Sequence, residues 1–159
     1  MIVVSNAGPL IALARIERLD VLPALYQEIA IPPAVREEVL GADRKGFSVL
    51  KAANWLRVEA VSDQTAVTLL RERLDAGESE TIVLALELET DLLLMDEARG
   101  RRIAAARGMP LTGTLGTLLL AKRKQLIERV EPLLADLAAQ GFRMSDALYR
   151  HILQEAGEG

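Results

Sequence analysis

The sequence predicts an α/β domain in which a mainly parallel sheet carries helices on both faces. Short apolar segments alternate with longer helical ones, which is the order of βαβ units. Two of the short segments, 2–5 and 92–95, are almost wholly apolar, as in strands that are buried on both faces. Half of the 159 residues are hydrophobic and only 3% are aromatic. One domain with an aliphatic core is therefore expected.

The first part of the chain is expected to hold three strands, at residues 2–5, 28–31 and 55–61. Pro9 and Pro33 suit the first turns of helices, and Asp20 suits an N-cap. The helices expected here cover 10–16, a short stretch after Asp20, and 33–40. Residues 41–46 have the composition of a loop.

The second part of the chain is expected to be mostly helical. Ser62 or Asp63 can cap a helix, and Gly77 interrupts before the next one. Residues 92–95 should form a central strand, and 108–111 a short link or strand. The expected helices run from the cap to about residue 74 and over 78–89, 98–107, 115–124, 128–140 and 145–155. The whole chain, 1–159, is expected to form a single domain, with C-terminal helices at about 128–156 packed on it.

Composition excludes several kinds of site. The chain has no Cys, which rules out disulfides, thiolate zinc sites and a cysteine nucleophile. His151 is the only histidine, so histidine metal clusters and a Ser-His-Asp triad elsewhere in the chain are excluded. Carboxylates remain as the obvious catalytic groups. A net charge of −4 means that RNA binding would need a local basic patch, a metal or a partner.

No apolar run is long enough to span a membrane, and the first residues do not resemble a signal peptide. A cytoplasmic location is therefore expected.

Acidic or amide side chains follow the expected strands or begin the helices after them. In open α/β sheets, ligands bind beyond the carboxyl ends of the strands. The residues at such positions are Asn6, Glu37, Glu38, Glu78, Glu80, Asp96 and Glu97. Oxygen ligands without His or Cys suit Mg²⁺ or Mn²⁺, which can activate water and orient a phosphodiester.

Each of these acidic residues also has a structural interpretation. Glu78 and Glu80 can complement a helix dipole, and Asp96 can cap a helix. Glu37 can be an ordinary solvated surface charge. Residue type and position alone leave these alternatives open.

Five segments resemble the motifs of PIN-domain proteins, most closely those of a VapC-like toxin branch. In order they are 4–13, 31–39, 74–80, 93–97 and 112–116. The resemblance implies a PIN-like three-layer α/β/α sandwich and a Mg²⁺- or Mn²⁺-dependent endoribonuclease, the toxin of a toxin–antitoxin pair. It also implies an RNA substrate, an antitoxin protein that covers the acidic site, and a homodimer. No association with membranes is expected, because the apolar runs are short.

Carried over by position, the resemblance implies catalytic residues Asn6, Glu38, Glu78, Glu80 and Asp96. The implied metal ligands among them are Asn6, Glu38, Glu78 and Asp96, and the motif does not separate Glu78 from Glu80. The family pattern has Asp where this chain has Asn6. An amide oxygen can bind a hard cation but brings no charge, so weaker Mg²⁺ binding and weak or absent catalysis are expected.

Four further residues are candidates for substrate binding. Arg101 and Arg102 are close in sequence to Asp96 and are expected to contact a phosphate backbone or to pair with Asp96. Thr112 and Thr114 can position a phosphate or a water, although a helix N-cap by Thr114 or a neighbour is the preferred interpretation.

The alternative function is a PIN-fold module that binds RNA or protein with little or no catalysis. Asn6 and the acidic net charge favour it. A Rossmann-type small-molecule domain ranks lowest, because the chain has no Gly-rich phosphate loop.

Overall fold

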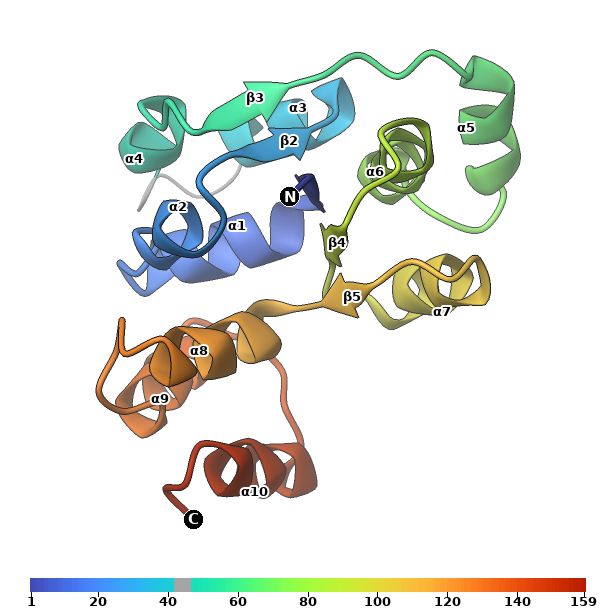
Figure 1. Cartoon of the computed structure of the whole chain (residues 1–159). Coiled ribbons are helices and arrows are strands. Elements are labelled where there is room, and N and C mark those ends of the chain that lie inside the picture. Colours follow the sequence, from blue (N-terminus) through green and yellow to red (C-terminus); the bar gives the residue numbers. More distant parts are fainter. Residues whose placement is uncertain (42–46) are drawn as a thin grey trace.

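The computed structural model describes residues 1–41 and 47–159. Its sheet has five strands, all parallel, in the order β3-β2-β1-β4-β5 (Figure 1). The strands are β1 (Val3–Ser5), β2 (Ile29–Ile31), β3 (Leu56–Val58), β4 (Leu92–Leu94) and β5 (Leu111–Thr112). All four predicted strands are confirmed in a shorter form, and the predicted link at 108–111 leads into an edge strand.

Ten helices are found among the described residues. They are α1 (Ala7–Arg15), α2 (Val21–Tyr26), α3 (Pro33–Gly41), α4 (Phe47–Lys51), α5 (Gln64–Leu70), α6 (Ala76–Glu87), α7 (Ala98–Ala106), α8 (Thr114–Arg123), α9 (Glu131–Ala139) and α10 (Asp146–Glu155). Helix α4 was not predicted. The predicted loop at 41–46 lies outside the described residues, except that Gly41 ends α3.

The prediction that Gly77 interrupts the helices is wrong. Helix α6 starts before it, because Asp75 and Glu78 form a capping box. The Asp75 carboxylate accepts from the Glu78 amide at 2.8 Å, and the Glu78 carboxylate accepts from the Asp75 amide at 3.2 Å. Two orphan amides of the first turn are thereby satisfied, and α5 ends earlier than predicted, at Leu70.

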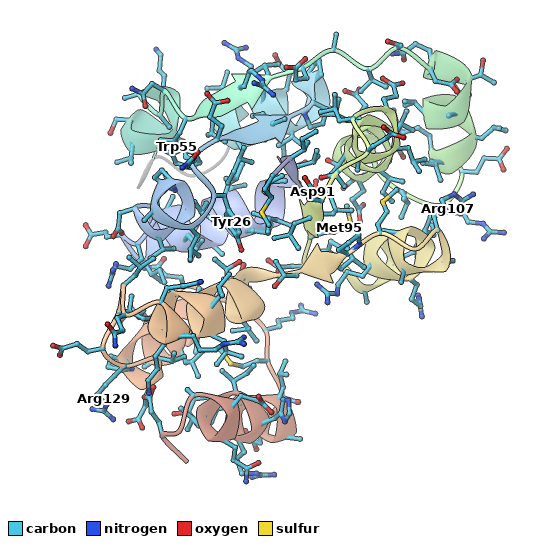
Figure 2. All side chains as sticks on the ribbon, in the orientation of Figure 1. Tyr26, Trp55, Asp91, Met95, Arg107 and Arg129 are labelled. Atoms are coloured by element: carbon cyan, nitrogen blue, oxygen red, sulfur yellow. The ribbon has the colours of Figure 1, made fainter. Side chains whose placement is uncertain are left out.

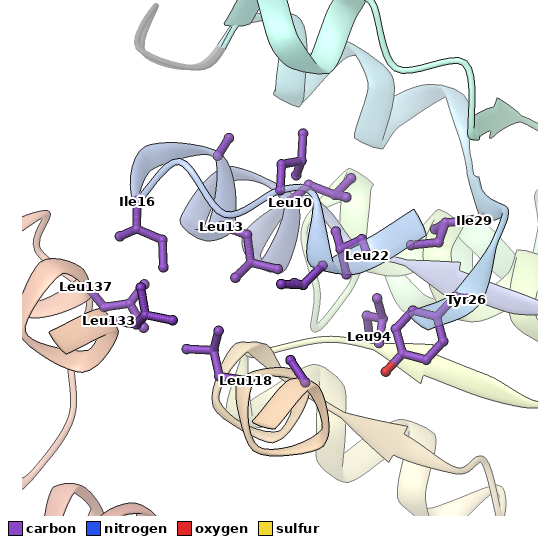
Figure 3. Close-up of a cluster of buried hydrophobic side chains, with 14 of the residues drawn as sticks. Leu10, Leu13, Ile16, Leu22, Tyr26, Ile29, Leu94, Leu118, Leu133 and Leu137 are labelled. Atoms are coloured by element: carbon purple, nitrogen blue, oxygen red, sulfur yellow. The ribbon is translucent and has the colours of Figure 1, made fainter. Parts of the chain in front are cut away.

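Two hydrophobic clusters cover the two faces of the sheet, as alternation along the strands requires. Val3 and Leu94 belong to the cluster under α1, α2, α8 and α9, which Figure 3 shows in part. Val4 and Leu93 belong to the cluster under α5, α6 and α7. The apolar stripe of α9 lies in the first cluster, with Leu134 fully buried. The three layers of the predicted α/β/α sandwich are therefore present.

None of the helices in the described ranges has the length and apolar character needed to cross a membrane.

The Glu158 carboxylate joins α8, α9 and the segment after α10. It accepts from the Val130 and Glu131 amides at 2.7 and 3.0 Å, at the start of α9. It also lies 2.8 Å from Nζ of Lys122 on α8, and the same Nζ donates to the Ala156 carbonyl. We call this group of contacts the Glu158 clamp. The negative charge is stabilised by the dipole of the helix whose N-terminus it contacts and by the hydrogen bond from the neighbouring ammonium group.

The Glu158 clamp makes the stability of the protein depend on pH. Burial by itself would raise the pKa of Glu158, but hydrogen bonds from Lys122, Val130 and Glu131 and the charge of Lys122 outweigh it and lower the pKa from 4.5 to about 2. Folding therefore favours the charged form. This contribution to stability is complete above about pH 5 and is lost as the pH falls through the folded-state pKa.

We predict that Glu158→Gln destabilises the protein at pH 7 by about 1.5–3 kcal/mol, since it weakens charge-assisted hydrogen bonds. The difference from the wild type should shrink as the pH falls from about 5 towards 2. Urea unfolding over this pH range measures it. Glu155→Gln, on the exposed face of α10, is the control. An unchanged difference at low pH would show that the charge of Glu158 does not carry the effect.

Candidate functional site

The central strands β1 and β4 end side by side at one edge of the sheet. Ser5 pairs with Leu94, and the Asn6 amide continues the ladder by donating to the Leu94 carbonyl at 2.9 Å. The chain runs from β1 outward to β2 and β3 and then returns to β4 on the other side of β1. This reversal of direction is where α/β sheets bind ligands. Asn6 and Asp96 follow β1 and β4 at that position.

Three side-chain oxygens surround Gly77 at the start of α6. A Cβ built on Gly77 would lie 2.7 Å from Oε1 of Glu38, 3.5 Å from Oδ1 of Asn6 and 3.6 Å from Oδ1 of Asp75. The three residues come from α3, the end of β1 and the N-cap of α6. We call them the Gly77 cluster. A side chain at this position would displace the exposed Glu38 carboxylate.

Glu78 is buried beside this cluster, with 8% of its surface exposed. Burial, together with the charges of Asp75 and Glu97, raises the pKa of Glu78 from 4.5 to about 6, although the Asp75 amide works against the rise. The pKa of Glu38 is also raised, by burial first and then by Asp75 and Glu97. Glu38 and Glu78 therefore share the same negative surroundings.

Asp96 is held by the N-terminus of the next helix but one. One of its oxygens accepts from the Thr114 amide at 2.8 Å and the other from the Thr114 hydroxyl at 2.7 Å. Asp96 thus caps α8, and Glu97 takes the N-cap position of α7. The predicted N-cap by Thr114 or a neighbour falls on the neighbour Gly113, and Thr114 is the first residue of the helix. Thr114 is fully buried.

The remaining candidates lie apart from the Gly77 cluster. Glu80 accepts from the Ala34 amide at 3.1 Å, at the start of α3, so it has a structural role there. Glu37 points to Arg36 at 3.8 Å, and 78% of its side chain is exposed. The structure therefore brings Asn6 and Glu38 together with Asp75. It places the Glu78 carboxylate against the Asp75 amide, and it leaves Glu80 and Glu37 outside.

The basic candidates are on α7. Arg101 donates to the Met95 carbonyl at 2.7 Å, and Arg102 is exposed. Met95 itself is buried at the centre of the molecule, where Figure 2 labels it. Arg101 thus stabilises the turn after β4 in which Asp96 lies.

A groove of about 790 Å³ begins at Asp96 and extends towards the C-terminal helices. Its polar lining includes Asp96, Glu97, Arg101, Thr112 and two further arginines, Arg15 and Arg143. Leu148 and Ile152 of α10 line its far side. The Gly77 cluster is not part of this lining, so the acidic edge has two adjoining parts.

Asp75 was not predicted as a site residue, although it lies in the segment 74–80. Its spacing of three residues before Glu78 is the signal of a capping box, which gives it a sufficient structural explanation. Glu97, which raises the pKa of Glu38 and Glu78, was noted only for its position after the strand.

The donor atoms at this edge suit a hard cation. They are carboxylate and amide oxygens, and the carboxylates repel one another, so a cation would relieve the repulsion. As the side chains lie, no three His, Asp or Glu residues in the described ranges are close enough together to hold a metal ion. The three oxygens around Gly77 include the amide of Asn6, and they give the best fit to such an ion.

Comparison with known proteins gives one match. The sequence matches the family model described as PIN domain over residues 2–158. Searches of curated proteins and of solved structures gave no match. The match covers nearly the whole sequence, and the parallel five-stranded sheet between two helical layers agrees with it. The chain belongs to the PIN-domain family.

Proposed function

We propose that this protein is a divalent-cation-dependent endoribonuclease and the toxin of a toxin–antitoxin pair. The observation that carries the proposal is the approach of the Asn6, Glu38 and Asp75 side-chain oxygens to one point beside Gly77, at the edge where β1 and β4 end in a PIN-family sheet. Buried or crowded carboxylates are unfavourable without a counter-charge, and a site for a cation explains their presence.

The residues at the carboxyl edge of the sheet have different roles in this proposal. Asn6 and Glu38 would hold Mg²⁺ or Mn²⁺, which when bound activates water and orients a phosphodiester. Glu78 supports Asp75 by accepting its amide hydrogen at 3.2 Å. Asp96 keeps unused lone pairs towards the groove, since each of its oxygens accepts one hydrogen bond from Thr114.

The groove offers a path for RNA despite the net negative charge. Arg15, Arg101 and Arg143 line it, and together they form the local basic patch that phosphate binding needs. Thr112 also lines the groove. Arg102 is exposed on α7 but is not in the lining, and we propose that it extends the patch. An antitoxin that fills the groove would block the approach to Asp96. A homodimer is part of the same proposal.

A PIN-fold binding module with little catalysis is the second candidate. Asn6 supports it, because it brings no charge to the edge, and so does the engagement of both Asp96 oxygens by Thr114.

We predict that the purified protein cleaves a mixed RNA pool with Mn²⁺, and that Glu38→Gln and Asp96→Asn each reduce the rate by about 100-fold or more. Glu37→Gln is the matched control, because Glu37 is the neighbour of Glu38 but points to solvent. Gel analysis of end-labelled RNA measures the rates. Equal cleavage by all four proteins would indicate a contaminating nuclease. RNA binding without cleavage would favour the binding module.

We also predict that Asn6→Asp tightens Mn²⁺ binding by about tenfold, because it adds a negative charge at a buried position. Titration calorimetry measures the affinity, and the rise in melting temperature on adding Mn²⁺ gives a second reading. Without the cation, the variant should be less stable than the wild type, since the new carboxylate faces Glu38. Unchanged affinity would mean that Asn6 is not at the cation site.

A further inference from the structure

Asn6 is buried, and the described part of the chain offers its side-chain oxygen only one weak hydrogen bond. Only 4% of Asn6 is exposed, and the nearest donor to its Oδ1 is the Thr81 hydroxyl at 3.5 Å. That hydroxyl also donates to the Gly77 carbonyl at 2.6 Å. A hydroxyl has one hydrogen, and the shorter contact takes it. Leaving a buried acceptor unpaired is costly, so the Asn6 oxygen points to a missing partner.

The missing partner would be positively charged. Oδ1 of Asn6 shares the space beside Gly77 with Oε1 of Glu38 and Oδ1 of Asp75, all within 3.6 Å of one point. Two carboxylates and an amide oxygen form a set that a hard divalent cation prefers, and Mg²⁺ usually keeps several of its waters beside such ligands.

Asp75 is suited to be a ligand as well as a helix cap. Its Oδ1 accepts from the Glu78 amide at 2.8 Å, and this bond uses one of the two lone pairs of the oxygen. The bond also fixes the orientation of the carboxylate. Asp75 is exposed to solvent, so a hydrated ion can reach it.

We propose that Asp75 is a cation ligand that supplies the negative charge missing at Asn6, so that Asn6, Glu38 and Asp75 form a divalent-cation site against Gly77. This proposal rests on the proposed function, which requires a divalent cation. It separates cation binding from Asp96, which is held by α8 and faces the groove.

The test replaces Asp75 with Asn, which caps helices as well as Asp does but carries no charge. Asp75→Asn should lower the Mn²⁺ affinity in titration calorimetry by about tenfold or more, while far-UV circular dichroism stays unchanged. Asp63→Asn is the matched control: Asp63 caps α5 by accepting from the Ala66 amide at 3.0 Å, away from the Gly77 cluster. It should leave the affinity unchanged.

Two further variants examine the geometry. Asn6→Asp in the Asp75→Asn background should restore most of the lost affinity, because it returns one negative charge to the same space. Gly77→Ala should weaken Mn²⁺ binding by displacing the Glu38 carboxylate, whereas Gly41→Ala, at the end of α3 with no described residue within 4 Å of an added Cβ, should not.

Wild-type affinity in Asp75→Asn, or no Mn²⁺ binding by the wild type, would overturn the proposal. Mn²⁺ binding that depends on Asp75 in a protein that cleaves no RNA would support the site and reject the nuclease. RNA cleavage with Mn²⁺ binding independent of Asp75 would do the reverse.

Discussion

The parallel pairing of β1 with β4 is the interaction on which the acidic edge depends. It aligns Val4 with Leu93 and Ser5 with Leu94, so the two strands end level with each other. The residues that follow, Asn6 and Asp96, are then set at one edge without any contact between their own side chains. The register is strongly specified, because a slip by one residue would exchange the side chains that face the two hydrophobic clusters.

Helix N-termini compensate for the negative charge at this edge. Helices α1, α6, α7 and α8 all begin here, after Asn6, Asp75, Glu97 and Gly113. Their exposed amides carry a partial positive charge, and two of the acids, Asp75 and Asp96, accept hydrogen bonds directly from such amides. The folded chain can therefore hold several carboxylates close together. Burial is the main cause of the raised pKa of Glu38 and Glu78, and the charges of Asp75 and Glu97 add to it.

The fold could be predicted because local sequence patterns specify its strands and helices. The buried strands are short apolar runs, and the helices between them have recognisable starts at Pro9, Pro33 and Asp63. The site was harder, because its geometry depends on how α3 and α6 are rotated about their axes. Glu78 and Glu80 are two positions apart on one helix and point to different sides, one to Asp75 and the other to Ala34. Asp75 was missed because the helix was expected to start after Gly77, which left Asp75 outside it, whereas Asp75 is the N-cap of α6.

The Glu158 clamp has a consequence for how mutations in this protein are interpreted. Helix α10 forms one wall of the groove through Leu148 and Ile152, and the clamp fastens the chain just beyond that helix to α8 and α9. The wall of the groove is thus joined to the rest of the protein by an ion pair that, within the described ranges, makes no hydrogen bond to Asp96 or Glu97 at the opposite end of the groove. If the proposed function holds, a substitution at Lys122 or Glu158 is expected to alter the fit of a long substrate even in molecules that remain folded, so reduced turnover in such a variant would not identify either residue as part of the reaction centre.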